Sequence, residues 1–130
     1  YGQCAISNQP SFHVPYIYSE LGKPEKTALH MKELFKRFNS GYRGFPGDED
    51  NGTTSAWDLL SAMGLYQVAP SRPDFATSLP LFDKMTVKLA NGNVLNIDKS
   101  KYDLTKMSGN VSYFDVMSGG DLSEIVKNKE

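Results

Sequence analysis

The apolar residues of this chain change their spacing near Pro70, and this change most restricts the folds that the sequence can adopt. Before Pro70 they recur at intervals of three and four, as on one face of an amphipathic helix. After Pro70 they alternate with polar residues, which is typical of a half-buried strand. Helices followed by strands predict an α+β fold rather than a βαβ sheet. We therefore divide the chain into residues 1–69 and residues 70–130.

Two longer helices are expected in the first part. One begins near Pro24, which suits a first helical turn, and ends near residues 39–41. Its apolar stripe consists of Ala28, Met31, Leu34, Phe35 and Phe38. The second helix is expected to begin with Ser55 as its N-cap and Asp58 in the capping-box position.

The second part is expected to hold a β-hairpin. Apolar residues alternate with polar ones over residues 85–89, and a second strand is expected at 94–97. The Asn-Gly pair at 91–92 between them favours a tight turn. Weaker strand patterns occur at 66–69, 111–115 and 122–126.

Composition excludes several classes of protein. The chain is 39% hydrophobic and 22% charged, which predicts a globular domain. Its net charge is −1 and it has no basic run, so we expect no nucleic-acid partner. No apolar run approaches the roughly 20 residues that span a bilayer. The single cysteine, Cys4, excludes an internal disulfide, and the start at Tyr1 leads us to expect a piece of a longer protein.

Three consecutive carboxylates lie in the segment 47–52, which reads Gly-Asp-Glu-Asp-Asn-Gly. In an extended stretch Asp48 and Asp50 point to the same side, and Glu49 points to the other. Two such carboxylates can bind a hard cation such as Ca²⁺. They can also act as a general base, because close like charges raise one pKa.

Other interpretations of the acidic segment remain open. The spacing argues against an EF-hand, because the glycine comes one place early and the twelfth position is Leu59. The carboxylates can instead complement the dipole of the following helix, or form a solvated turn. Outside the segment, His13 is either a packed core group or a ligand-facing one. Trp57 either stacks on a sugar or belongs to the core.

Several segments, in order, resemble the C-terminal part of glycoside hydrolase family 92, the calcium-dependent exo-α-mannosidases. They are residues 8–18 (NQPSFHVPYIY), 22–27 (GKPEKT), 47–52 (GDEDNG) followed by 55–57 (SAW), and 78–84 (SLPLFDK) with the Asn-Gly pair at 91–92. The combination covers nearly the whole chain and thins after Ile97. No single segment would be specific.

The resemblance implies a fold, a reaction and a metal. This chain would supply the last helices of an (α/α)6 barrel, with its acidic loop in residues 1–69, and closing antiparallel β-strands in residues 70–130. The reaction would be inverting hydrolysis of terminal α-mannosides, α-1,2-linked, with Asp50 as the main base beside Asp48. Asn8, Gln9 and Asp50 would bind Ca²⁺. The residues implied in substrate binding are His13 and Trp57.

The implied partners are a mannose-containing glycan and the remainder of the parent chain, including an N-terminal β-sandwich. The parent would be secreted, periplasmic or at the cell surface. Because the family's general acid lies upstream, the isolated chain is predicted to be inactive. The barrel helices would lack neighbours, so apolar faces near Phe35, Phe38 and Leu60 should be exposed unless another chain covers them.

Two departures from the family pattern favour an alternative function. Thr54 stands where the family usually has Met, and Asp58 stands where it usually has Tyr. The alternative is a non-catalytic carbohydrate- or calcium-binding module on the same fold. An interaction domain that binds no ligand is the third possibility.

Overall fold

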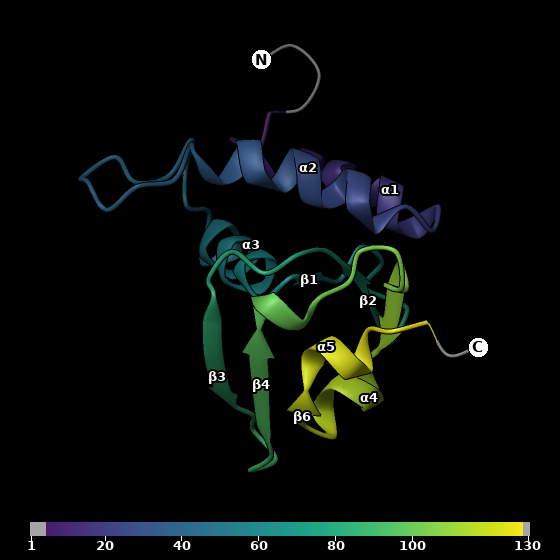
Figure 1. Ribbon diagram of the computed structural model, residues 1–130. Coiled ribbons are helices and arrows are strands. Elements are labelled where there is room, and N and C mark those ends of the chain that lie inside the picture. The colour runs from purple at the N-terminus through teal and green to yellow at the C-terminus, as the bar shows by residue number, and fades with distance from the viewer. Residues whose placement is uncertain (1–4, 129–130) are drawn as a thin grey trace.

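The structure, a computed structural model, describes residues 5–128, so Cys4 lies outside the described residues. Figure 1 shows α1 and α2 lying across one side, the strands on the other, and α3 between them. Helices thus come mainly from the first part of the chain and strands from the second. This mixed content confirms the predicted α+β class.

The helices are short apart from α2 and α3. Their bounds are α1 Ile17–Glu20, α2 Pro24–Phe35, α3 Thr53–Ala62, α4 Tyr113–Met117 and α5 Leu122–Ile125. Three single-turn 3₁₀ helices cover Gln9–Ser11, Val14–Tyr16 and Lys99–Lys101. The strands are β1 Leu65–Tyr66, β2 Asp74–Thr77, β3 Lys84–Lys88, β4 Val94–Asp98, β5 Asn110–Ser112 and β6 Gly120–Asp121.

The strands of the described part of the chain form two sheets of three. One has the order β1-β2-β5, with antiparallel pairs. The other has the order β3-β4-β6, in which β3 and β4 are antiparallel and β4 and β6 are parallel. Because β1 precedes Pro70 and β2 follows it, their pairing joins the helical part of the chain to the strand part.

Among residues 5–128, two apolar clusters form the interior. The first lies among the strands and the C-terminal helices: Leu65, Leu95, Ile97, Met107, Val111, Val116, Leu122 and Val126. The second, which we call the helical core, joins the N-terminal segment to α2, α3 and β2: Ile6, Phe12, Tyr16, Met31, Leu34, Trp57 and Ala76. The helical core includes Trp57 of α3, and α3 begins directly after the acidic segment. The core therefore supports the position of that segment.

A buried polar contact also joins helices to a sheet. The Oγ of Ser19 in α1 donates to the carbonyl O of Thr77 in β2 at 2.6 Å. Thr27 of α2 lies beside it, with its Oγ1 2.7 Å from the Ser19 Oγ. All three residues are fully buried. The hydroxyl groups of Ser19 and Thr27 and the backbone carbonyl of Thr77 therefore satisfy one another where water does not reach.

The expected hairpin is confirmed by β3 and β4, which pair from Lys84–Asp98 to Lys88–Val94. The helix expected from Pro24 is confirmed as α2, although it ends at Phe35. The strand expected at 122–126 is wrong, because that segment forms α5. The strand expected at 111–115 is only partly right, because β5 ends at Ser112 and α4 follows.

Side-chain caps explain these two differences. The carboxylate of Asp121 accepts a hydrogen bond from the backbone N–H of Ser123 at 3.0 Å, at the start of α5. The hydroxyl of Ser112 accepts one from the N–H of Phe114 at 3.2 Å, at the start of α4. Such caps begin a helix at a defined residue whatever the apolar spacing that follows.

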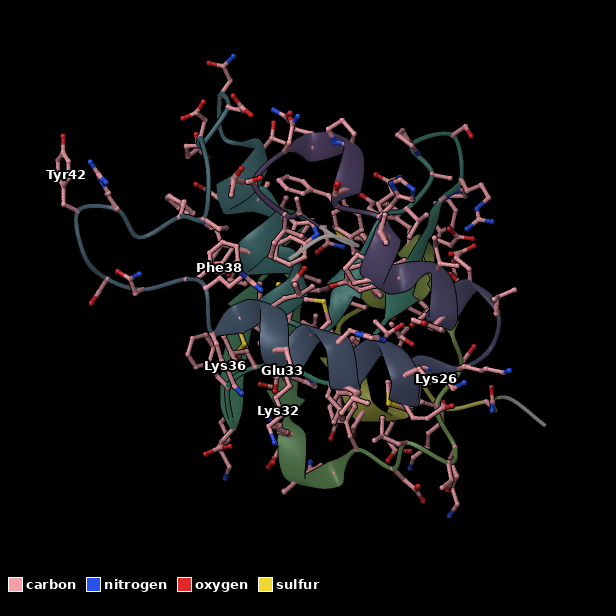
Figure 2. All side chains as sticks on the ribbon, turned by 90° about the horizontal axis from the view of Figure 1, so that it is seen from above. Lys26, Lys32, Glu33, Lys36, Phe38 and Tyr42 are labelled. Atoms are coloured by element: carbon pink, nitrogen blue, oxygen red, sulfur yellow. The ribbon has the colours of Figure 1, made fainter. Side chains whose placement is uncertain are left out.

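The apolar faces expected near Phe35, Phe38 and Leu60 are half-buried rather than exposed. The two phenylalanines pack against Trp57, with ring centroids 6.3 and 5.7 Å away. The exposed apolar side chain of α2 is instead Leu29, which is 65% exposed. Figure 2 shows the charged face of α2 turned to solvent, with Tyr42 at the outer end of the loop that follows.

Candidate functional site

The acidic segment, residues 47–52, leads directly into α3, which begins at Thr53. Gly52 is the N-cap residue, so the prediction that Ser55 begins the helix is wrong by three positions. The cap is supplied by Glu49, whose Oε2 accepts from the N–H of Gly52 at 2.6 Å. Its Oε1 accepts from the N–H of Ser55 at 3.1 Å and from the Ser55 hydroxyl at 2.6 Å.

These hydrogen bonds, led by the one from the Ser55 hydroxyl, hold the pKa of Glu49 below its ordinary value. A carboxylate at a helix N-terminus is also favoured by the helix dipole. For Glu49, therefore, the dipole interpretation of the acidic segment applies. The sequence does carry a signal for this role of Glu49, because an acidic residue stands three positions before the glycine that precedes a helix. The alternation of the carboxylates does not reveal this role.

The backbone of the segment turns sharply at its end. Asp50 and Asn51 have φ values of 55° and 57°, and Gly52 has 90°. Aspartate and asparagine tolerate the left-handed region better than other residues with a side chain. Because Asp50 is left-handed, the alternation of an extended strand does not set the direction of its carboxylate.

Asp50 lies beside the N-terminal segment. The side-chain Nε2 of Gln9 donates a hydrogen bond to Oδ2 of Asp50. Close by, the backbone of Gly47 packs so tightly on Ser7 that a Cβ there would lie 2.4 Å from the Ser7 carbonyl O. The structure thus brings together two segments that lie about 40 residues apart in the sequence.

The remaining predicted residues lie nearby or in the core. Asn8 is exposed and caps the 3₁₀ helix Gln9–Ser11, with its carbonyl O accepting from Ser11 N–H at 3.1 Å. His13 is exposed. Within residues 5–128, no hydrogen bond joins the side chain of either residue to the acidic segment. Asp48 is exposed, and its carbonyl O accepts from the Thr54 hydroxyl at 3.0 Å.

Trp57 requires a correction, because it is only 1% exposed. Its Nε1 donates to the carbonyl O of Phe12 at 2.9 Å, and the ring of Phe38 stacks on it. The indole therefore offers no surface on which a sugar can stack. Its location agrees with the core interpretation and makes it a support for α3.

The two departures from the family pattern take different places in α3. Thr54 is buried, and its hydroxyl holds the carbonyl of Asp48, as described above. Asp58 is half-buried, and this burial raises the pKa of its carboxyl. The charge that Asp58 adds is therefore partly withdrawn from solvent.

The donor set suits a hard cation but is incomplete. Gln9, Asn8 and Asp50 offer amide and carboxylate oxygens, the ligand type that Ca²⁺ prefers, whereas Ca²⁺ takes six to eight ligands. Among the described residues, no group of three or more His, Cys, Asp or Glu side chains could hold a metal ion. A calcium site here would thus need further oxygens from water, substrate or another part of the protein.

A groove of about 420 Å³ lies elsewhere, between α2 and residues 79–81, and no residue of the acidic segment lines it. The candidate site is thus a surface cluster. Among the described helices, none has both the length and the apolar character needed to cross a membrane.

Comparisons with known proteins agree with these motifs. Residues 1–118 match the sequence profile of the glycosyl hydrolase family 92 catalytic domain. A protein described as an uncharacterized secreted glycosidase of Arthroderma benhamiae is 30% identical over 104 residues, which cover 75% of this chain and 13% of that protein.

Solved structures give the same answer for the fold. A family 92 inverting mannosidase of Bacteroides thetaiotaomicron has a TM-score of 0.78 and 34% identity, over 92% of this chain and 18% of that chain. A family 92 α-mannosidase of the same organism, solved with mannoimidazole, has a TM-score of 0.78 and 24% identity, over 88% of this chain and 17% of that one.

This chain therefore spans less than a fifth of the length of these relatives. The family match covers most of the chain, including the acidic segment and the segment that contacts it. The chain belongs to glycosyl hydrolase family 92, a family of glycosidases with mannosidase members.

Proposed function

We propose that this chain is the C-terminal part of an inverting, calcium-dependent α-mannosidase that removes terminal α-1,2-linked mannose from glycans. The observation that carries the proposal is the hydrogen bond between Gln9 and Asp50. It joins two of the motifs on which the family resemblance rests. A relative described as an inverting mannosidase, 34% identical to this chain, supports the reaction class.

In this proposal Asp50 is the general base. An inverting glycosidase uses a carboxylate on one face of the sugar to activate water, and an acid on the other face to protonate the leaving oxygen. The carboxylate of Asp50 is exposed to solvent, and among the described residues only Gln9 binds it. Its other oxygen, Oδ1, can therefore accept a proton from water. Asp48 assists as a second carboxylate.

The general acid would come from the upstream part of the protein. We expect the 130-residue chain alone not to hydrolyse mannosides for that reason. Its helices would be the last ones of an (α/α)6 barrel, and the upstream barrel helices with the N-terminal β-sandwich would complete the enzyme. Because a curated relative is described as secreted, we propose a secreted, periplasmic or cell-surface parent.

Gln9, Asn8 and Asp50 would hold the calcium ion. A bound Ca²⁺ would supply a positive charge that orients the sugar hydroxyls. If the amide of Gln9 keeps its contact with Asp50, it leaves the Gln9 carbonyl oxygen available as a ligand. His13, which is exposed, would contact the substrate.

Substitution of Asp50 in the full-length protein tests the proposal. Asp50→Asn keeps the size and one acceptor oxygen, so folding should be retained. We expect kcat for an α-1,2-mannobioside to fall by about 10²–10⁴-fold, the usual contribution of a general base. Asp83→Asn, an exposed carboxylate outside the site, is the matched control. Wild-type turnover in Asp50→Asn would remove Asp50 from the mechanism.

A binding module on the same fold is the alternative, and one observation favours it. Asp58, in place of an aromatic residue, puts a half-buried carboxyl in the helix that follows the acidic segment. A module would bind mannose or Ca²⁺ and raise the Tm of the full-length protein without releasing mannose. Turnover that is lost in Asp50→Asn would rule out the module.

A further inference from the structure

The end of the acidic segment adopts an unfavourable backbone conformation. Asp50 and Asn51 are consecutive non-glycine residues with positive φ, and Gly52 continues in the same region. Residues with a side chain keep such a conformation only where their surroundings hold it. The side chain of Asp50 is exposed, so packing around it does not hold the turn. Its positive φ is also not favoured by the backbone alone. A specific contact is therefore needed to keep this conformation.

Glu49 supplies that contact from the preceding position. Its carboxylate reaches over the two left-handed residues to the N–H of Gly52 and to both donors of Ser55. Its backbone carbonyl also accepts from the N–H of Thr54 at 3.1 Å. Glu49 therefore binds the chain on the far side of Asp50 through both its side chain and its backbone.

The contact also removes Glu49 from the candidate metal and substrate site. Both of its carboxylate oxygens accept hydrogen bonds from the first turn of α3. Asp50, one residue later, instead accepts from Gln9, which comes from a different part of the chain. Two neighbouring carboxylates are thus given different partners.

We propose that Glu49 is a positioning residue, which clamps the turn at 50–52 to α3 and so holds the carboxylate of Asp50 against Gln9. The proposal rests on the proposed function for its catalytic consequence, but the placement of Asp50 can be measured without activity. Without the clamp, the turn relaxes to more favourable φ values and the carboxylate leaves Gln9. A residue that only stabilised α3 would not affect the side chain of Gln9.

Two variants, one control and a reference variant, Asp50→Ala, separate these roles. Glu49→Ala removes every side-chain contact of the clamp. Glu49→Gln keeps the length and one acceptor oxygen, so it should restore part of the effect and should fold if Glu49→Ala does not. Leu59→Gly is the control for helix stability, because it weakens α3 at a side chain that is 64% exposed and lies seven residues beyond Gly52.

The first measurement follows the side-chain amide signals of Gln9 by ¹H–¹⁵N NMR in the 130-residue chain. In Glu49→Ala they should move toward the positions that they have in Asp50→Ala, and Leu59→Gly should leave them unchanged. Glu49→Gln should lie between Glu49→Ala and the wild type. If they stay at their wild-type positions in both Glu49 variants, the proposal is overturned, whatever the protein does with mannosides.

The second measurement is the kinetics of the full-length protein. In Glu49→Ala, kcat should fall by about 10- to 100-fold with little change in KM, because a misplacement of about 1 Å can cost about 100-fold. Leu59→Gly should change kcat by less than about twofold, since surface changes of this kind act on stability. A loss in Glu49→Ala no larger than that in Leu59→Gly overturns the catalytic role.

The two measurements also separate this proposal from the proposed function. If the wild-type full-length protein releases no mannose, the proposed function fails and the NMR comparison alone decides the placement. If the protein is active and the Gln9 signals do not respond to Glu49, the proposed function stands and the clamp is rejected.

Discussion

Trp57 of α3 donates a hydrogen bond from its indole N–H to the carbonyl O of Phe12, at 2.9 Å. The bond ties the helix that follows the acidic segment to the chain just after Gln9. Both residues are 1% exposed, and the centroids of their rings lie 5.6 Å apart. The two segments that form the candidate site are therefore held together through the helical core as well as at the surface.

Loss of this anchor should be costly for folding. Trp57→Ala should lower the free energy of unfolding by about 3–5 kcal/mol, the usual range for a buried tryptophan. Leu59→Ala, on the exposed side of the same helix, should change it by no more than about 0.5 kcal/mol. Urea unfolding followed by circular dichroism measures both. Equal losses in the two variants would contradict the buried position of Trp57.

Two tyrosines whose hydroxyl groups are buried should respond differently to the loss of the hydroxyl. The Tyr16 hydroxyl donates to the Ser61 Oγ at 2.7 Å, so Tyr16→Phe should cost about 1 kcal/mol of unfolding free energy. The Tyr102 hydroxyl is buried and has no hydrogen-bond partner among the described residues. Tyr102→Phe should therefore leave stability unchanged or raise it. Urea midpoints of the two variants give the comparison, and a clear loss in Tyr102→Phe would show an additional partner.

The carboxyl of Asp58 should favour the folded state at acid pH rather than at neutral pH. Burial raises the pKa of Asp58 in the folded state above its unfolded value. A group shifted upward contributes stability below its unfolded pKa, of about 3.9, and loses this contribution as pH rises through the folded value. Asp58→Asn should therefore raise Tm at pH 7 and do so less at pH 4. Thermal unfolding at the two pH values measures this, and an equal gain at both would contradict the shift.

The contact between Gly47 and Ser7 should not tolerate an added methyl group. A Cβ at Gly47 would lie 2.4 Å from a backbone oxygen, so the chain must move, at a cost of about 1–3 kcal/mol. At Gly41 the added Cβ would lie 2.9 Å from the flexible side-chain oxygen of Asn39. Gly41→Ala should therefore cost much less than Gly47→Ala. Unfolding midpoints of the two variants test this, and a larger loss at Gly41 would contradict the close approach at Ser7.

The fold could be predicted from the sequence where local spacing decides the structure. Alternation and an Asn-Gly turn, in which Gly92 has a φ of 88°, were sufficient for the hairpin of β3 and β4. β2 was missed because it pairs with β1 and β5, and β5 lies more than 30 residues away in the sequence. The residue pattern of 122–126 favours a strand, whereas α5 is a single turn of helix that depends on its cap, Asp121, rather than on a repeated pattern.

The candidate site was predictable only in part. The nearness of Gln9 and Asp50 followed from the resemblance of the motifs to a family, since nothing in the spacing of the residues relates positions 41 apart. The different partners of Glu49 and Asp50 could not be obtained from alternation, because Asp50 is left-handed. Trp57 was open to two interpretations, and its burial depends on phenylalanines contributed by other segments.

The contact between Ser19 and Thr77 has a consequence for how the chain unfolds. If the strands melted first, the Ser19 hydroxyl would lose its acceptor in β2, and a typical intramolecular hydrogen bond contributes about 1 kcal/mol to stability. If the helices melted first, the Thr77 carbonyl would lose its donor in the same way. Neither part can therefore unfold alone without breaking this hydrogen bond, so the contact couples the stability of the helices to that of the strands.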